Sequence, residues 1–472
     1  MDASKQFARY MEHLAEGLGH ADRHAGLTGY CTGLMLPLPR KSVEPMAARI
    51  EPLHVSAKHQ SMHHFVAKAG WSDQGLLARV AQWVGSHMDM SQGGYWIVDD
   101  TGFPKKGVHS VGVARQYCGM LGKQDNCQVA VSVSLSCESG SLPVAWQLYL
   151  PKAWAEDAAR RMRAGVPEEL GFATKPQIAL QQIKALLNAQ PEGGAARCVL
   201  ADAGYGVDSA FRRGLTELGL AYVVGVTSVV SVWPPGVLPG AALPYSGRGR
   251  PPIMPRRGAT RQPMSVKALA HTLPPGAWQT IQWREGSNNT LTGRFAALRV
   301  RSAGGNRARA RLLPEQWLLI EWPDNQAEPE KYCLSTLPAT HTLSELVNAA
   351  HQRWRIERDY QDLKQDLGLG HYEGRGWRGF HHHASLAIAA YGYLMAQRLK
   401  EGNDADSKKN FIVGQLPVLP KHQRPRGAAT STASRARLNH NTTTTTGKRA
   451  RSHRRPLPPL PVGQSTPSLV TQ

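Results

Sequence analysis

The sequence has few cysteines, comparatively few acidic residues and no long apolar run. Its six cysteines are scattered and form no C-x-x-C pair, which argues against a zinc site and against a disulfide framework. The first residues lack the apolar core of a signal peptide, and no stretch approaches the roughly 18 apolar residues of a membrane span. We therefore expect a cytoplasmic protein with reduced thiols and no membrane association.

Acidic residues are scarce relative to basic ones. The chain has 35 Asp and Glu against 56 Lys and Arg, a formal net charge of +21 and a pI near 9.9. Such a balance is typical of proteins that bind a polyanion, most often nucleic acid, and predicts association with the nucleoid. A basic tail without a partner is the alternative, because the 66 residues beyond Asp406 contain 12 Lys and Arg and no acid.

Changes in apolar periodicity divide the 472 residues into five segments, and 41% hydrophobic residues are enough for a core. Residues 1–88 show helical spacing and predict a helical N-terminal domain, which we expect to bind DNA. Residues 89–225 alternate between strands and helices, 226–335 form short β-like pieces between Pro- and Gly-rich loops, and 336–399 return to helical spacing. Residues 400–472 lose all periodicity and predict a disordered basic tail.

Short apolar runs and alternating patterns predict the strands of an α/β fold. The predicted strands are YWIVDD (95–100), QVAVSVSLSC (128–137), SLPVAWQLYL (141–150), RCVLAD (197–202) and AYVVGV (221–226). A long helix is predicted over 342–370, and a second helix over 385–399 is apolar nearly all round, which indicates a core position.

Two of the predicted strands end in an aspartate. Asp100 closes YWIVDD and Asp202 closes RCVLAD. An acid at the end of a buried strand lies at the rim of a sheet, where ligands commonly bind in open α/β folds. One such residue is usually a turn or cap, but two after buried runs favour a site.

A third acid, Glu357, lies in the long predicted helix. Arg353 precedes it by four residues and Lys364 follows by seven, so the three share one helix face. A solvated face with ion pairs is the ordinary explanation of this spacing. Three carboxylates would, however, suit two Mg²⁺ ions about 3.5–4 Å apart, with Mn²⁺ as a substitute, that activate a hydroxyl against a phosphodiester.

Several ordered motifs together resemble a known family. DDTGFPKKGVHSVGVARQYCGMLGKQDNCQVAVS (99–132), LYLPKAWAED (148–157), VLADAGYG (199–206) and RWRIERDYQDLK (353–364) are similar to blocks of the DDE-superfamily insertion-sequence transposases. The resemblance covers roughly residues 25–400. It implies an RNase H-like catalytic core with an all-β insertion, and it implies nicking at transposon ends followed by strand transfer into target DNA.

The resemblance assigns roles to individual residues. Asp100, Asp202 and Glu357 match the three catalytic metal ligands, and Asp99 is the alternative for the first, because alternation allows only one of the pair to face the metals. Arg353 and Lys364 are expected at DNA phosphates. A tyrosine that often precedes the arginine by three residues is Ala350 here, so His351 or Tyr360 are candidates for its phosphate contact.

Further DNA contacts are weaker predictions. Lys105, Lys106 and Arg115 follow the first aspartates and could approach phosphates, although a solvated loop fits them equally well. Trp317, Trp322 and Tyr332 lie on strands of the insertion, where related transposases stack a flipped base on an aromatic ring. Core packing is the alternative for each. The Gly- and Arg-rich stretch 247–251 fits a linker better than a minor-groove element.

The sequence thus predicts a DNA transposase that acts on double-stranded DNA as a homodimer on paired ends. A transposase-derived DNA-binding protein without catalytic activity is the first alternative, and the intact set of three acids argues against it. A glycosidase with paired acids is the second. The basic charge and the residues Arg353 and Lys364 argue against that enzyme. His381 to His383 are not expected to bind a metal together, because three consecutive residues cannot share one helix face.

Overall fold

The structure is a computed structural model of the chain, and it describes residues 3–91, 93–189, 196–238, 247–248, 262–285, 290–303 and 313–403. All of these residues belong to one compact unit, Met1–Leu419. The predicted disordered tail, apart from residues 400–403, and the end of the stretch 247–251 lie outside the described residues.

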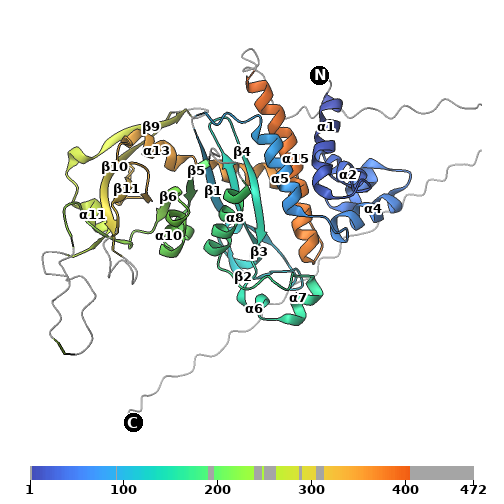
Figure 1. Cartoon of the computed structure of the whole chain (residues 1–472), viewed down its shortest axis with the longest axis horizontal. Helices are drawn as coiled ribbons and strands as arrows, with labels where there is room; N and C mark the ends of the chain where they lie inside the picture. The colour runs from blue at the N-terminus through green and yellow to red at the C-terminus, as the bar shows by residue number, and fades with distance from the viewer. Residues whose placement is uncertain are drawn as a thin grey trace, which may run out of the picture. The chain divides into compact units, whose positions relative to one another are not determined.

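The N-terminal segment is helical, as predicted, and it packs against the last helix of the chain (Figure 1). Its elements are α1 (Ala3–Ala15), η1 (Glu16–Leu18), α2 (Arg23–Met35), α3 (Val43–Ile50), α4 (Val55–Ala67) and α5 (Asp73–Gly85), and the last helix is α15 (Trp377–Asn403). The Tyr10 hydroxyl donates to the Ala389 carbonyl at 2.8 Å, in the middle of α15. The apolar character of α15 is explained by this burial, which confirms the predicted core position.

The strands of the described residues form one mixed sheet. They are β1 (Gly94–Pro104), β2 (Ala114–Cys118), β3 (Lys123–Ser136), β4 (Ser141–Leu148), β5 (Ala196–Ala201), β6 (Ala221–Val226), β7 (Ser231–Trp233), β8 (Met264–Ser265), β9 (Gln279–Glu285), β10 (Thr290–Ser302), β11 (Gln316–Glu321) and β12 (Lys331–Ser335). All five strands predicted over 95–226 are present, and β1 extends beyond its aspartates to Pro104.

The strand order is β2-β3-β1-β5-β6-β12-β11-β10-β7-β8, with β4 paired to β3 and β9 to β10. The pairs β1–β5 and β5–β6 are parallel, and the others are antiparallel. The predicted insertion therefore continues the sheet through β12, which pairs with β6. It is not all-β, because it contains α11 (Val266–His271) and η3 (Pro275–Ala277).

The other helices connect or cover the strands. They are η2 (Gly119–Leu121), α6 (Lys152–Ala155), α7 (Ala158–Ala164), α8 (Lys175–Ala189), α9 (Ala203–Gly206), α10 (Ser209–Glu217), α13 (Leu343–His351) and α14 (Trp354–Gln365). The prediction of one continuous helix over 342–370 is wrong, because a turn at Gln352 and Arg353 separates α13 from α14. A capping box between Thr342 and Glu345 starts α13.

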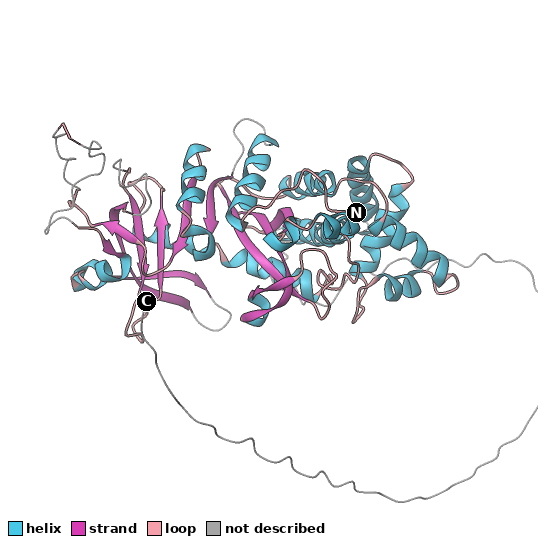
Figure 2. Ribbon diagram, turned by 90° about the horizontal axis from the view of Figure 1, so that it is seen from below, coloured by secondary structure: helices cyan, strands magenta, loops and turns pink. Residues whose placement is uncertain are grey.

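The sheet is covered on both faces, and each face has its own core (Figure 2). Ile97 of β1 packs in the core that contains Ile356 and Leu363 of α14 and much of α15. Its neighbour Val98 packs in the core that contains Ile178 of α8. Among the described residues, no helix is both long enough and apolar enough to cross a bilayer.

Candidate active site

The two adjacent aspartates of β1 face opposite sides of the sheet. Side chains alternate along a strand, so Asp99 shares the face of Ile97, which α14 covers. Asp100 shares the face of Val98, which α8 covers. The choice between the two acids, which the sequence left open, becomes a question of which helix each one meets.

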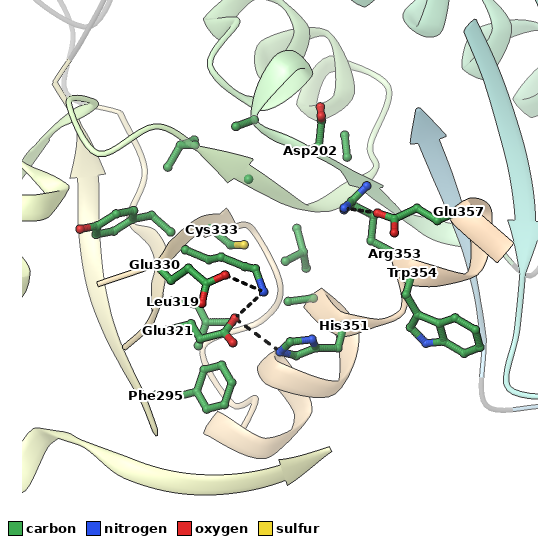
Figure 3. A pocket seen from close by; sticks show the side chains of 18 residues that line it. Asp202, Phe295, Leu319, Glu321, Glu330, Cys333, His351, Arg353, Trp354 and Glu357 are labelled. Carbon is green, nitrogen blue, oxygen red and sulfur yellow. Dashed lines mark hydrogen bonds and ion pairs between the residues drawn. The ribbon is translucent and has the colours of Figure 1, made fainter. Parts of the chain in front are cut away.

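Asp99 meets the start of α14 through Arg353. The guanidinium of Arg353 lies 3.2 Å from Asp99 Oδ2 and 2.5 Å from Glu357 Oε1, so it bridges an acid of β1 and an acid of α14 (the second pair is drawn in Figure 3). The Asp99 side chain is 15% exposed and that of Arg353 31% exposed. The turn between α13 and α14 places Arg353 over the sheet rim.

Asp202 lies beside this pair at the end of β5. The parallel register pairs Val98 of β1 with Ala201 of β5, which puts Asp202 level with Asp99. The Asp202 carboxylate caps α9 and accepts hydrogen bonds from the backbone N–H of Gly204 at 2.9 Å and of Tyr205 at 3.3 Å. Asp202, Arg353 and Glu357 line the same pocket.

Burial and the neighbouring charges shift the pKa values of Asp99 and Arg353. Burial raises the pKa of Asp99 to about 7, Arg353 opposes that rise, and the Asp202 and Asp100 carboxylates add to it. The pKa of Arg353 rises above its ordinary value, because attraction to Asp99, Glu357 and Asp202 outweighs its own desolvation. Perturbation of this kind is typical of functional sites, although structural ion-pair networks also cause it.

Asp100 has different partners on the other face. Its Oδ2 lies 3.1 Å from Lys175 Nζ of α8 and accepts a hydrogen bond from the Tyr205 hydroxyl at 3.3 Å. The structure therefore joins Asp99 and Glu357 through Arg353, places Asp202 in the same pocket as Arg353 and Glu357, and pairs Asp100 with Lys175 on the other face. Lys175 could not be assigned from the sequence, because helix α8 has no motif that marks it, and Tyr205 was not singled out although it lies in the motif VLADAGYG (199–206).

The three acids around Arg353 suit a hard divalent cation by their chemistry, since all of their donors are carboxylate oxygens. They do not form a ligand shell as they stand. No group of three His, Cys, Asp or Glu side chains in the described part of the chain is arranged to hold a metal. Arg353 supplies the positive charge between Asp99 and Glu357, and Asp202 is engaged by α9. The cap of α9 uses only Oδ1 of Asp202, so the contacts that compete with joint ligation of a cation are those of Arg353 with Asp99 and Glu357.

The pocket beside these acids, with a volume of about 380 Å³, reaches from the rim of the sheet to the insertion (Figure 3). At its far end the Glu321 carboxylate lies 3.3 Å from Lys331 Nζ and 3.8 Å from His351 Nε2. The His351 ring stacks on Trp283 of β9 with centroids 4.1 Å apart. Sequence reasoning missed Glu321 and Lys331 as pocket residues, since no local motif joins them to the three acids.

The lysines expected at DNA phosphates have protein partners. Lys364 Nζ donates to the Gly102 carbonyl at 3.0 Å, and Lys105 Nζ donates to the Tyr372 carbonyl at 3.1 Å. Burial lowers the pKa of both lysines. Lys106 and Arg115 are exposed. Contact of Lys364 or Lys105 with a phosphate would therefore replace a backbone bond, whereas Lys106 and Arg115 are accessible.

The three insertion aromatics differ in burial: Tyr332 is buried, whereas Trp317 and Trp322 are half-buried. Tyr332 of β12 is 4% exposed and belongs to one of the hydrophobic cores, and it also lines the pocket that contains Asp202, Arg353 and Glu357. Trp317 Nε1 donates to the Pro338 carbonyl at 3.1 Å, and Trp322 Nε1 donates to the Gln326 carbonyl at 3.0 Å.

The two candidates for the missing tyrosine contact are also engaged by protein groups. His351 is stacked on Trp283, and the Tyr360 hydroxyl lies 2.7 Å from Ser132 Oγ in a buried hydrogen bond. The three consecutive histidines of α15 point to three separate neighbours: His381 bonds the backbone N–H of Leu148, His382 the carbonyls of Val66 and Trp71, and His383 the Tyr30 hydroxyl and the Gly368 carbonyl.

Comparison with known families decides what kind of protein carries this site. The family of DDE superfamily endonucleases matches residues 13–290, which is more than half of the chain. The chain belongs to the DDE superfamily endonucleases. The matched region contains Asp99, Asp100 and Asp202, and Glu357 lies beyond it.

Individual proteins resemble this DDE superfamily endonuclease over part or most of its length. A probable transposase for insertion sequence element IS701 from Microchaete diplosiphon is 33% identical over 199 residues, which is 42% of this chain and 47% of that relative. The chain thus matches about half the length of this curated relative. A piggyBac transposase synaptic complex with hairpin DNA covers 85% of this chain and 80% of its own at 10% identity, with a TM-score of 0.36. The NurA nuclease from Sulfolobus solfataricus covers 63% and 83% at 8% identity, with a TM-score of 0.22.

Proposed function

We propose that this DDE superfamily endonuclease is a DNA transposase, which nicks DNA at the ends of a mobile element and joins the freed 3′ ends to target DNA. The observation that carries the proposal is that Arg353 pairs with both Asp99 and Glu357, while Asp202 lines the same pocket and lies level with Asp99. The likeness to a probable insertion-sequence transposase supports the same substrate class.

The sheet order supports an RNase H-like core for this activity. The antiparallel strands β4, β3 and β1 are continued by β5 and β6, which run parallel to β1. Asp99 lies on β1, the first strand of the parallel set, Asp202 follows β5, and Glu357 lies on the covering helix α14. Parallel strands β1 and β5 bring Asp99 and Asp202 to one rim, which is where such folds bind their ligands.

We take Asp99, and not Asp100, as the first carboxylate. Asp99, Asp202 and Glu357 would hold the divalent cations, Mg²⁺ with Mn²⁺ as a substitute. A pair of such ions activates an attacking hydroxyl and stabilises the leaving oxygen of a phosphodiester.

Arg353 has a second task in this proposal. It neutralises Asp99 and Glu357 before DNA arrives, and its planar guanidinium suits two oxygens of a phosphate equally well. A phosphate that takes Arg353 away from the acids would leave them free for cations, so binding of DNA and assembly of the site would be linked. Double-stranded DNA is the partner, and a homodimer would hold paired ends.

The first test is nicking of a plasmid that carries the genomic DNA on both sides of the coding region. Full-length protein should nick it with Mg²⁺, and a chelator should abolish the nicking. Asp202→Asn and Glu357→Gln should bind the plasmid but fail to nick it. The alternative of an inactive DNA-binding protein predicts binding without nicking by the unaltered protein.

A matched control is available in Asp208. It caps α10 through the backbone N–H of Ala210 and Phe211, as Asp202 caps α9, but it lies outside the pocket. Asp208→Asn should nick at close to the unaltered rate. Nicking by Asp202→Asn at the rate of this control would contradict the proposal.

A further inference from the structure

The hairpin formed by β2, η2 and β3 carries an exposed apolar tip. Tyr117 is 59% exposed, Met120 55% and Leu121 40%, and all three lie within five consecutive residues. Gly122, with φ of 62°, closes the turn that presents them. Large apolar side chains gathered at a projecting turn indicate a binding surface more often than chance exposure.

The surroundings of this tip are basic. Arg115 is exposed and lies on the same face of β2 as Tyr117, because residues two apart share a strand face. Lys123, directly after the turn, is exposed and pairs with Asp125 at 3.2 Å. Two basic residues, Arg115 and Lys123, against one acid, Asp125, give the surface around the apolar tip a net positive charge. Such a surface suits DNA, a polyanion whose bases have apolar faces.

The hairpin is attached to the strand and the helix that carry two of the site acids. A Cβ atom added at Gly102 of β1 would lie 2.7 Å from Cys118 Sγ, so only glycine allows the hairpin to pack this closely. Lys364 of α14 donates both to the Gly102 carbonyl at 3.0 Å and to Met120 Sδ at 3.7 Å. The tip is therefore fixed relative to the carboxylates.

Two counts give the same spacing, about 10 Å, between the acids and the two residues to which the hairpin is attached, Gly102 and Lys364. Gly102 is three residues beyond Asp99 on β1, which is about 10 Å along a strand. Lys364 is seven residues beyond Glu357 on α14, which is also about 10 Å along a helix. Successive phosphates of one DNA strand advance about 3.4 Å along the duplex, so this spacing corresponds to about three base pairs.

We propose that the tip of this hairpin, Tyr117 with Met120 and Leu121, is a wedge that enters DNA a few base pairs from the phosphate held by the carboxylates. The proposal rests on the proposed function and adds a DNA-opening element to it. Apolar side chains unstack base steps in many bent complexes, and an aromatic ring stacks on a freed base of any sequence. Arg115 and Lys123 would hold the flanking phosphates.

The test compares two 30-base-pair duplexes of one sequence, fully paired or with a central bubble of three unpaired nucleotides. Binding is followed by fluorescence anisotropy of the full-length protein in a chelator, which prevents cleavage. The unaltered protein should bind the bubble duplex more tightly. Tyr117→Ala with Met120→Ala should lose about 5- to 150-fold in affinity for the bubble duplex and little for the paired one.

Three variants control the result. Tyr117→Phe keeps the ring and should keep the preference for the bubble. Arg115→Ala should weaken both duplexes and lower the salt slope by about 1. Leu53→Ala removes a side chain that is 88% exposed in the N-terminal helices and should change neither affinity.

The outcomes separate the two proposals. Equal loss on both duplexes, no loss in the double variant, or no preference for the bubble by the unaltered protein would overturn the wedge and leave the proposed function standing. A double variant that changes the oligomeric state but not DNA binding would assign the tip to a second copy of the chain and overturn the wedge as well. Failure of the unaltered protein to bind either duplex would reject the proposed function itself.

Discussion

The two faces of β1 give its neighbouring aspartates, Asp99 and Asp100, different partners. On the face of α14, Asp99 shares Arg353 with Glu357 and lies level with Asp202. On the face of α8, Asp100 forms one ion pair with Lys175 and accepts one bond from Tyr205. On the α14 face, the acids share a single positive side chain, that of Arg353, and their negative charge exceeds it. On the α8 face, the pair of Asp100 and Lys175 is locally neutral. Charge balance is therefore the property by which the proposal separates Asp99 from Asp100.

The largest effect is expected when each aspartate is neutralised in turn. Asp99→Asn should lower the plasmid nicking rate by about 100- to 1000-fold or more, because it removes charge that acts at the reacting phosphate. Asp100→Asn should lower the nicking rate by at most about 10-fold, which is the lower end of the effect of groups that support a site without touching the reacting atoms. A larger loss with Asp100→Asn than with Asp99→Asn would reverse the comparison.

Removal of Arg353 should expose the excess of negative charge on the α14 face. Arg353→Ala leaves Asp99 partly buried without its partner, and we expect a loss of about 1–3 kcal/mol in the free energy of unfolding, less than for a fully buried pair because Arg353 is 31% exposed. Urea denaturation measures it. Mg²⁺ should restore more stability to this variant than to the unaltered protein.

The control for this experiment is Arg213→Ala, which removes an exposed partner of Glu217 in α10. This variant should lose less than about 0.5 kcal/mol in the free energy of unfolding, and Mg²⁺ should not restore that loss. If Arg353→Ala behaved in the same way, the carboxylates would not depend on Arg353 for their charge balance.

A smaller effect is expected on the α8 face. Lys175→Met removes the partner of Asp100, and because Lys175 is 29% exposed and Asp100 25% exposed, we expect a loss of about 1 kcal/mol. Nicking should stay within about 10-fold of the unaltered rate. Loss of metal-dependent nicking in this variant would show that the α8 face belongs to the site.

The smallest effect concerns Tyr360, on the buried side of α14. Tyr360→Phe removes its bond to Ser132 and should cost about 1 kcal/mol in thermal or urea unfolding. DNA affinity should not change, because the hydroxyl is directed into the core. A clear drop in affinity, with stability intact, would instead assign Tyr360 to a phosphate and support the role that the sequence suggested as one option.

Much of the fold could be predicted from the sequence, because strands and core helices leave clear periodic patterns. The strands over 95–226 and the apolar helix α15 were of this kind. The break at Gln352 and Arg353 could not be predicted, since the helical pattern continues through it and no proline or glycine marks the turn. The short strand β2 was also missed, because its five residues alternate only weakly.

The candidate site was predictable in kind but not in detail. Acids after buried apolar runs drew attention to Asp100 and Asp202, with Asp99 as the alternative to Asp100, and the family resemblance assigned Glu357, because helical spacing alone favoured a solvated face. Which aspartate of the pair meets Glu357 depends on the helix that covers each face, and that is a long-range property. Lys364 was expected at a phosphate, but its neighbourhood includes Gly102 of β1, 262 residues away along the chain.

Direct measurement of bound Mn²⁺ tests the central claim, that cations bind on the α14 face of β1. The unaltered protein, Asp99→Asn and Asp100→Asn would be titrated with Mn²⁺ and the free ion counted by electron paramagnetic resonance, in the presence of duplex DNA. The account predicts that Asp99→Asn loses at least one bound ion and that Asp100→Asn keeps the unaltered number. Loss of bound ions from Asp100→Asn, with full binding by Asp99→Asn, would contradict it.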